Sequence, residues 1–269
     1  IKIKCKIKIL KKGILLILLT ITISEFLGQS IINTEKMFKD SKEGLGISSK
    51  LSGNSIQGNA SVLFLNFSLN FSYKKEKHYL RLLSGGSNIT KDNEWVSNNL
   101  FSQFRYNYLI NDKTKLFAFS QLQSNAILLL ERRFLVGAGL RKSVLNFSKD
   151  TTRNFKIDLS AGLMQEEELL NTDNLQLNEK FYTNYTRMIF SLVSVLDFKN
   201  KCTIVNTTYF QQYVLNLEDF RLLNEFNLMF NINKNLAFSI DLIYRFDSEP
   251  PSILTNKDLN TNVGLLFKL

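Results

Sequence analysis

The chain has 269 residues, and its 34 Lys and Arg against 24 Asp and Glu give a formal net charge of +10. Six lysines lie before Gly13, so the rest of the chain is only mildly basic and its charge does not indicate a nucleic-acid partner. With only two cysteines and two prolines, the chain has no framework of several disulfides, and almost every backbone N–H is free to donate to a sheet.

The first residues have the organisation of a secretory signal peptide. A basic stretch before Gly13 precedes an apolar run over 14–23, which is shorter than the ~20 residues that a membrane-spanning helix needs. We therefore predict a signal peptide over 1–28, a short periplasmic leader over 29–43 and a single domain over 44–269. A retained N-terminal membrane anchor is the alternative.

The domain shows strand-like alternation almost throughout. In 62–73, Leu65, Phe67 and Leu69 share one parity, while the residues between them are polar. Successive side chains of a strand point to opposite faces, so this pattern indicates one apolar and one polar face. Twelve segments are predicted as strands on this basis: 45–51, 62–73, 79–84, 100–109, 116–123, 129–145, 154–164, 181–196, 202–214, 221–232, 235–247 and 259–269.

The connections between these strands alternate in length. Long ones are predicted at 85–94, 165–180 and 247–258, and a turn at Ser52–Ser55. Short ones are predicted at 73–77, 111–113, 199–201 and 233–235, and 146–153 is of middling length. Short periplasmic turns opposite longer outside loops are typical of an even-stranded outer-membrane barrel. We predict an all-β fold: an antiparallel transmembrane β-barrel of about 12 strands with up-and-down hairpin topology, located in the bacterial outer membrane.

Three short motifs resemble those of one known family. They are Ser52-Gly53-Asn54-Ser55, then Arg133 followed by Gly137-Ala138-Gly139-Leu140, and finally YRFDSEP over 244–250. In this order the motifs resemble the uncharacterised salt-induced (YdiY-like) outer-membrane proteins, over residues 44–269. That family has no agreed activity, so the resemblance implies a fold and a location more than a function.

The polar parity of the strands is predicted to face the barrel lumen. Reading this parity also collects Arg81 and Arg187, whose parities are the least defined. Without these two, six basic and five acidic residues point inward, so any anion preference would be weak. Buried charges need partners, so a network of pairs that braces the wall is one interpretation, and a weakly anion-favouring passage is the other. The predicted lumen-facing charged residues are Arg105, Glu131, Arg133, Arg141, Lys156, Asp158, Arg221, Glu225, Asp241, Arg245 and Asp247.

Catalytic, cofactor and metal motifs are not found in the sequence. The single histidine, His78, has no neighbouring nucleophile motif and is predicted to lie on the surface or at the rim. Glu166-Glu167-Glu168 offers carboxylates for a divalent cation, but a solvated loop is the preferred interpretation. We therefore assign no catalytic, cofactor or metal residues.

Three functions remain from the sequence. The first is passive passage of small polar or anionic solutes, and the second is a structural, stress-related or adhesive barrel with a side-chain-filled lumen. A lipid-modifying enzyme is a remote third. A barrel of about twelve strands falls between the filled eight-stranded and the open 16–18-stranded cases, so the sequence leaves the first two open. The expected partners are outer-membrane lipids, the barrel-assembly machinery and small polar solutes.

Overall fold

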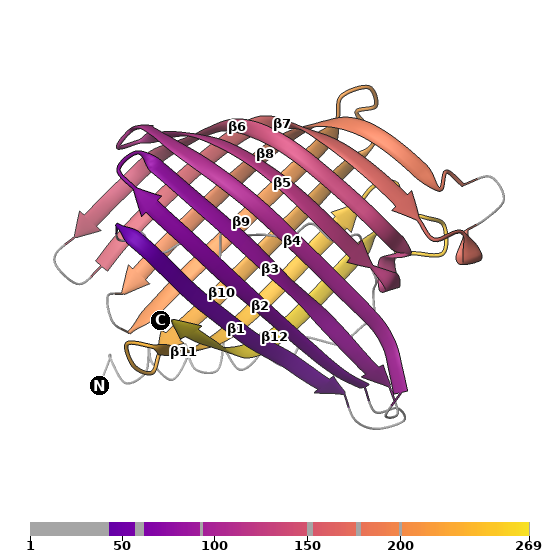
Figure 1. The fold of residues 1–269 in the computed structure, drawn as a ribbon, viewed down its shortest axis with the longest axis horizontal. Coiled ribbons are helices and arrows are strands. Elements are labelled where there is room, and N and C mark those ends of the chain that lie inside the picture. The colour runs from indigo at the N-terminus through magenta and orange to yellow at the C-terminus, as the bar shows by residue number, and fades with distance from the viewer. Residues whose placement is uncertain are drawn as a thin grey trace, which may run out of the picture.

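The computed structural model describes residues 43–56, 62–91, 94–149, 153–175, 179–198 and 201–268. The predicted signal peptide and nearly all of the predicted leader lie outside these residues. In the described part, twelve antiparallel strands close into one barrel, as predicted (Figure 1). The strands are β1 Gly44–Ile56, β2 Val62–Lys75, β3 His78–Lys91, β4 Glu94–Asn111, β5 Thr114–Asn125, β6 Leu130–Lys149, β7 Arg153–Leu170, β8 Tyr182–Phe198, β9 Cys202–Tyr213, β10 Phe220–Asn231, β11 Leu236–Asp247 and β12 Lys257–Lys268.

Each strand pairs with its neighbours in sequence, and β1 closes the barrel against β12. The closing seam has the fewest paired residues in the described chain, from Ser48 with Lys268 to Gly53 with Val263. The β6–β7 hairpin is much longer and runs from Leu130 with Leu170 to Lys149 with Arg153. Pairing of consecutive strands is the topology that hairpin connections produce.

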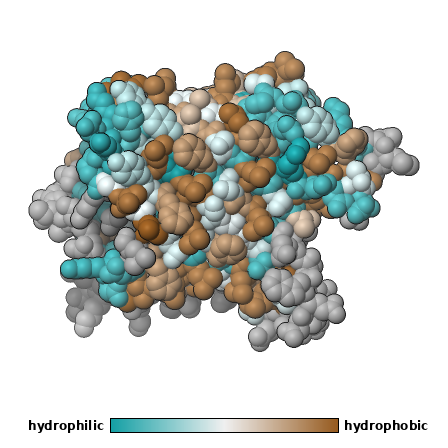
Figure 2. Space-filling view, in the orientation of Figure 1, coloured by the Kyte–Doolittle hydropathy of each residue, from teal (hydrophilic) through white to brown (hydrophobic). Residues whose placement is uncertain are grey.

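The outer surface of the barrel is apolar over its middle. In β2, Leu65, Phe67 and Leu69 are exposed, whereas Asn70 and Ser72 are buried. The strands therefore turn their apolar parity outward, the reverse of a water-soluble barrel. Figure 2 shows hydrophobic side chains spread over the near wall, with hydrophilic side chains gathered toward its two ends.

Several predicted loops are strand instead. The Ser52–Ser55 turn lies inside β1, and most of 85–94 lies in β3. The reason is visible at Gly85, where a Cβ would lie 2.6 Å from the backbone oxygen of Phe67. Glycine there permits close approach within the sheet, although its polar surroundings had indicated a loop.

Two connections in the second half of the chain also differ from prediction. Residues 165–170 belong to β7, so the loop predicted over 165–180 shortens to 171–181 and contains the 3-10 helix Thr172–Asn174. The connection predicted over 146–153 is largely strand, because β6 continues to Lys149 and β7 begins at Arg153. None of the helices in the described residues is long and apolar enough to cross a membrane.

Candidate functional site: the barrel interior

The interior is richest in buried charge near one end, over β6 to β11. Among the largest fully buried side chains are Arg133, Glu166 and Arg187. They belong to a continuous set of seven ionised side chains from five strands and one connection, which we call the ionic cluster. Its members are Arg133, Glu166, Glu168, Arg187, Asp219, Arg221 and Asp247.

Arg221 is the centre of the ionic cluster. Its Nε donates to Oδ2 of Asp247 at 2.9 Å, and its Nη1 donates to both oxygens of Glu166 at 2.9 Å. Glu168 accepts from Nη1 at 2.8 Å and from Nη2 at 3.2 Å. Arg221 lies on β10 and both glutamates on β7, so these contacts pass over β8 and β9 and cross part of the interior.

Arg187 joins the cluster to the β9–β10 connection. Its two Nη atoms donate to the two carboxylate oxygens of Asp219, at 2.7 and 3.1 Å, and its Nε donates to Glu166 at 2.7 Å. The guanidinium also lies 5.6 and 5.9 Å from the ring centroids of Tyr185 and Tyr213, which stack on each other at 4.2 Å. A bidentate pair flanked by rings holds the guanidinium in one orientation.

Arg133 completes the cluster on β6. It is ion-paired with Glu168, and its Nε lies 3.8 Å from Oε2 of Glu166. Three guanidinium groups thus meet four carboxylates, a nearly balanced set. Buried ions are tolerated when paired and hydrogen-bonded in this way, and removing one member leaves the others uncompensated. The ionic cluster therefore ties the strands from β6 to β11 together.

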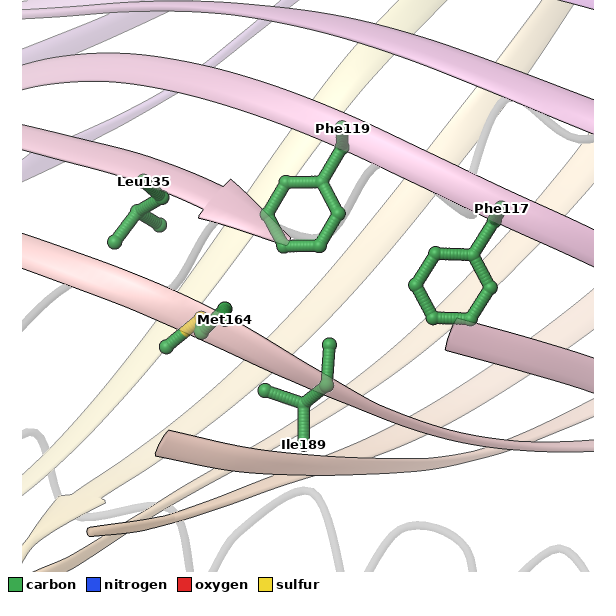
Figure 3. Packing of buried hydrophobic residues seen from close by; sticks show 5 residues of the cluster. All are labelled: Phe117, Phe119, Leu135, Met164 and Ile189. Carbon is green, nitrogen blue, oxygen red and sulfur yellow. The ribbon is translucent and has the colours of Figure 1, made fainter. Parts of the chain in front are cut away.

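An apolar layer lies directly beside the ionic cluster. Phe117, Phe119, Leu135, Met164 and Ile189 gather from β5, β6, β7 and β8 (Figure 3). Three of them follow or precede a cluster member by two residues on the same strand, so they share its inward face. Tyr209 packs against this group and also against Leu223 and Ile243, and together these residues carry the layer across to β11.

Two glycines of the Gly-Ala-Gly-Leu motif make room for this layer. A Cβ on Gly137 would lie 2.6 Å from the ring of Phe119, so a larger residue there would have to displace that ring. A Cβ on Gly139 would press first against the backbone oxygen of Ala161 on β7 and then, at 2.7 Å, against the ring of Phe117. The motif therefore has a packing role in the wall, where β5 and β6 face the interior.

Smaller ionic groups continue toward the end of the barrel where β1 begins and β12 ends. Arg141 donates to Oδ2 of Asp158 at 3.0 Å, and Lys156 lies 3.4 Å from the same oxygen. Lys50 reaches Asp241 at 2.5 Å over the intervening strand β12. Arg105 on β4 lies 4.9 Å over the ring of Phe117. At the opposite end, where β11 ends near Asp247 of the ionic cluster and β12 begins, Arg245 pairs with Asp258 at 3.0 Å.

Of the charged residues predicted to face the lumen, all but one are buried or partly buried. Seven are buried: Arg133, Arg141, Asp158, Arg221, Glu225, Asp241 and Asp247. Arg105, Lys156 and Arg245 are partly buried. Glu131 is exposed and corrects the prediction, because the register shifts between Leu130 and Arg132 and interrupts the alternation on which its inward placement rested.

Three members of the ionic cluster are absent from the predicted inward residues: Glu166, Glu168 and Asp219. Arg187, which the sequence places on the inward parity with little definition, is buried. Glu166 and Glu168 lie two and four residues beyond Met164 on one strand face, so the preference for a solvated loop at 166–168 is wrong for them. A metal site is not formed by groups of His, Cys, Asp or Glu in the described residues. His78 is exposed, as predicted, and its Nδ1 lies 2.7 Å from the Tyr106 hydroxyl.

The opposite part of the interior includes small polar residues beside the buried side chains of Tyr79, Arg81 and Leu83 on β3. On β1, β2 and β3 the inward positions include a set of partly exposed side chains without ionisable groups, which we call the polar strip. Its members are Ser48, Ser52, Asn66, Ser68 and Ser87. They are contiguous, since Ser52 pairs with Asn66, and Asn66 pairs with Ser87.

Comparison with known proteins places the chain in a family. The family described as "Protein of unknown function, DUF481" matches residues 49–269. The chain belongs to this family. No curated protein matches it at a significant level.

Solved structures share its fold at low sequence identity. The NanC porin is 11% identical, with a TM-score of 0.50 over 83% of this chain and 100% of that one. The KdgM porin, solved in complex with a disordered oligogalacturonate, is 12% identical, with a TM-score of 0.48 over 82% of this chain and 99% of that one. At this identity the likeness concerns the fold alone.

Proposed function

We propose that this chain is an integral barrel of the bacterial outer membrane. The observation that carries the proposal is the outward-facing apolar wall, which would be costly in water and is matched to lipid. A row of rings, Phe190, Phe210, Phe220 and Phe246, crosses four adjacent strands with centroids 5.3 to 6.5 Å apart, as in the aromatic girdle of such barrels. Barrel-assembly machinery is the expected partner for insertion.

The termini lie on the periplasmic side in this proposal. The turns at that end, such as 76–77 and 112–113, are short, and the connections 171–181 and 248–256 at the other end are longer. The ionic cluster then lies toward the cell exterior. Fractionation with the outer membrane and heat-modifiable migration in detergent gels test the location; recovery of the protein in the soluble periplasm would refute it.

The barrel serves as a narrow passage for small, uncharged polar solutes. The polar strip supports this function, because its side chains are small and partly exposed, and hydroxyls and amides replace hydration contacts without a net charge. An anion-selective passage has less support, because the inward charges described above are largely paired. The passage is bounded on its other side by the ionic cluster and the apolar layer.

A non-conducting structural barrel is the second candidate. The apolar layer favours it, because Phe117, Phe119 and Ile189 project into the interior and exclude water and ions there. No catalytic function is proposed for either candidate. The resemblance to salt-induced outer-membrane proteins is compatible with both candidates. Increased expression of this protein under osmotic stress would show that the resemblance includes its regulation.

Planar-bilayer recordings of the purified barrel separate the two candidates. A passage along the polar strip predicts small, stable conductance steps and a reversal potential near zero under a KCl gradient. If heat-modifiable migration shows that the protein is folded and no conductance steps appear, the structural barrel is favoured. A strong anion preference would contradict the balance of charge described here.

A further inference from the structure

An open groove of about 500 Å³ lies on the outer wall of the barrel, across β4 to β8. Of these strands, β6 and β7 run along the top of Figure 1. Most of the groove's lining side chains belong to the outward parity and are apolar. Small residues form its floor: Ala118 and Ala138 pair directly with each other, and Gly137 lies beside them. Phe104 and Tyr106 bound one side, and Leu163 bounds the other.

One border of the groove is polar and is joined to a hydrogen-bonded group on the same outer face. Gln165 and Thr186 line the groove, and the Thr186 hydroxyl donates to Oε1 of Gln165 at 2.6 Å. The Gln165 amide in turn donates to Asn184. Beyond them, Nη2 of Arg132 donates to Glu167 at 2.8 Å. We call these five residues the polar edge.

The polar edge lies toward the end of the barrel that carries the long connections. Arg132 is near the start of β6 and Asn184 near the start of β8, and both strands begin at that end. The Arg132 side chain is 55% exposed, so its guanidinium keeps N–H donors available beside the one that Glu167 occupies. The groove thus runs from an apolar slot to an exposed set of amides, a hydroxyl and a guanidinium.

We infer that this groove binds one acyl chain of lipid A, the phosphorylated, acylated disaccharide of the outer leaflet. The inference rests on the proposed membrane location and orientation. The apolar slot takes the chain, and the exposed guanidinium matches a phosphate, for which Arg is well suited. The amides and hydroxyl of Gln165, Asn184 and Thr186 match sugar hydroxyls.

Native mass spectrometry of the detergent-purified barrel tests the site, with lipid A and phosphatidylglycerol as separate probes. Wild-type protein should retain lipid A. Ala138→Trp fills the slot and should weaken retention about tenfold, roughly the effect of losing one or two good contacts. Ala161→Trp is the matched control, because Ala161 is also an exposed small residue of the outer face but does not line the groove. It should retain lipid A as wild type does.

The headgroup has its own variant. Phosphatidylglycerol should be retained weakly, because it lacks the sugar hydroxyls, and Arg132→Gln should reduce retention of lipid A by the larger factor. Equal retention by wild type and Ala138→Trp, or equal binding of the two probes, would overturn the inference. Heat-modifiable migration must show that each variant is folded. A folded outer-membrane barrel that binds no lipid A refutes the groove site alone, whereas recovery from the periplasm refutes the proposed function.

Discussion

The two sides of the barrel interior differ in how they are filled. From β5 to β11, long charged and aromatic side chains are buried against one another, and several contacts pass over intervening strands. On β1 to β3 the members of the polar strip remain partly exposed, although Tyr79, Arg81 and Leu83 on the same inward face of β3 are buried. The contrast is in how much ionic and aromatic packing each side carries, and the proposed passage depends on the side with less of it. Substitutions on each side, each compared with a matched control variant, test this contrast.

The largest effect is expected from Arg221→Met. The substitution leaves Glu166, Glu168 and Asp247 without their shared cation, and breaking a buried ion pair costs ~3–5 kcal/mol. Urea unfolding of the purified barrel, followed by the loss of heat-modifiable migration, measures it. Arg132→Met removes an exposed pair and should cost about 0–1 kcal/mol. Equal effects of the two would show that the ionic cluster does not brace the wall.

Phe119→Ala should follow, at ~3 kcal/mol, since large-to-small changes of a buried aromatic residue leave a cavity. It should also raise the single-channel conductance if the apolar layer bounds the passage. Phe104→Ala is its control, because Phe104 is exposed on the outer face and contributes nothing to the interior. A stability loss without any conductance change would favour the structural barrel.

A third test compares the two faces of one strand. Phe67→Arg puts a charge on the lipid-facing side of β2, which costs ~2–4 kcal/mol near the bilayer midplane. Ser68→Arg puts the same charge on the partly exposed inner side and should cost less. Refolding yield into lipid vesicles over a urea series gives both values. The reverse order would mean that the faces of β2 are exchanged, as in a slip by one residue.

The sequence was sufficient for the fold because period-two alternation survives in almost every strand. It failed where a polar or glycine-rich run continues a strand, as at Gly85 and at 165–170. Glu166 and Glu168 nevertheless continue the parity that begins at Asp158, so extending that alternation would have found them. Asp219 was not accessible to such reasoning, since it lies in a connection and its contact with Arg187 depends on three-dimensional closure.

The smallest effect on stability, and the most specific one on function, is expected from Ser68→Trp. Ser68 lies in the middle of the polar strip, between Lys50 on β1 and Gly85 on β3. Because Gly85 has no side chain, a large side chain at position 68 can extend over it. Stability should change by about 1 kcal/mol or less, as for a substitution at a partly exposed site. Conductance, however, should fall severalfold, because the indole occupies the space that the serine leaves open to solute. Ser68→Thr is the matched variant, which keeps the hydroxyl and adds one methyl group, and it should conduct as wild type does. A Ser68→Trp barrel that conducts normally would place the passage elsewhere in the interior, and the polar strip would then be only a wall of small residues beside it.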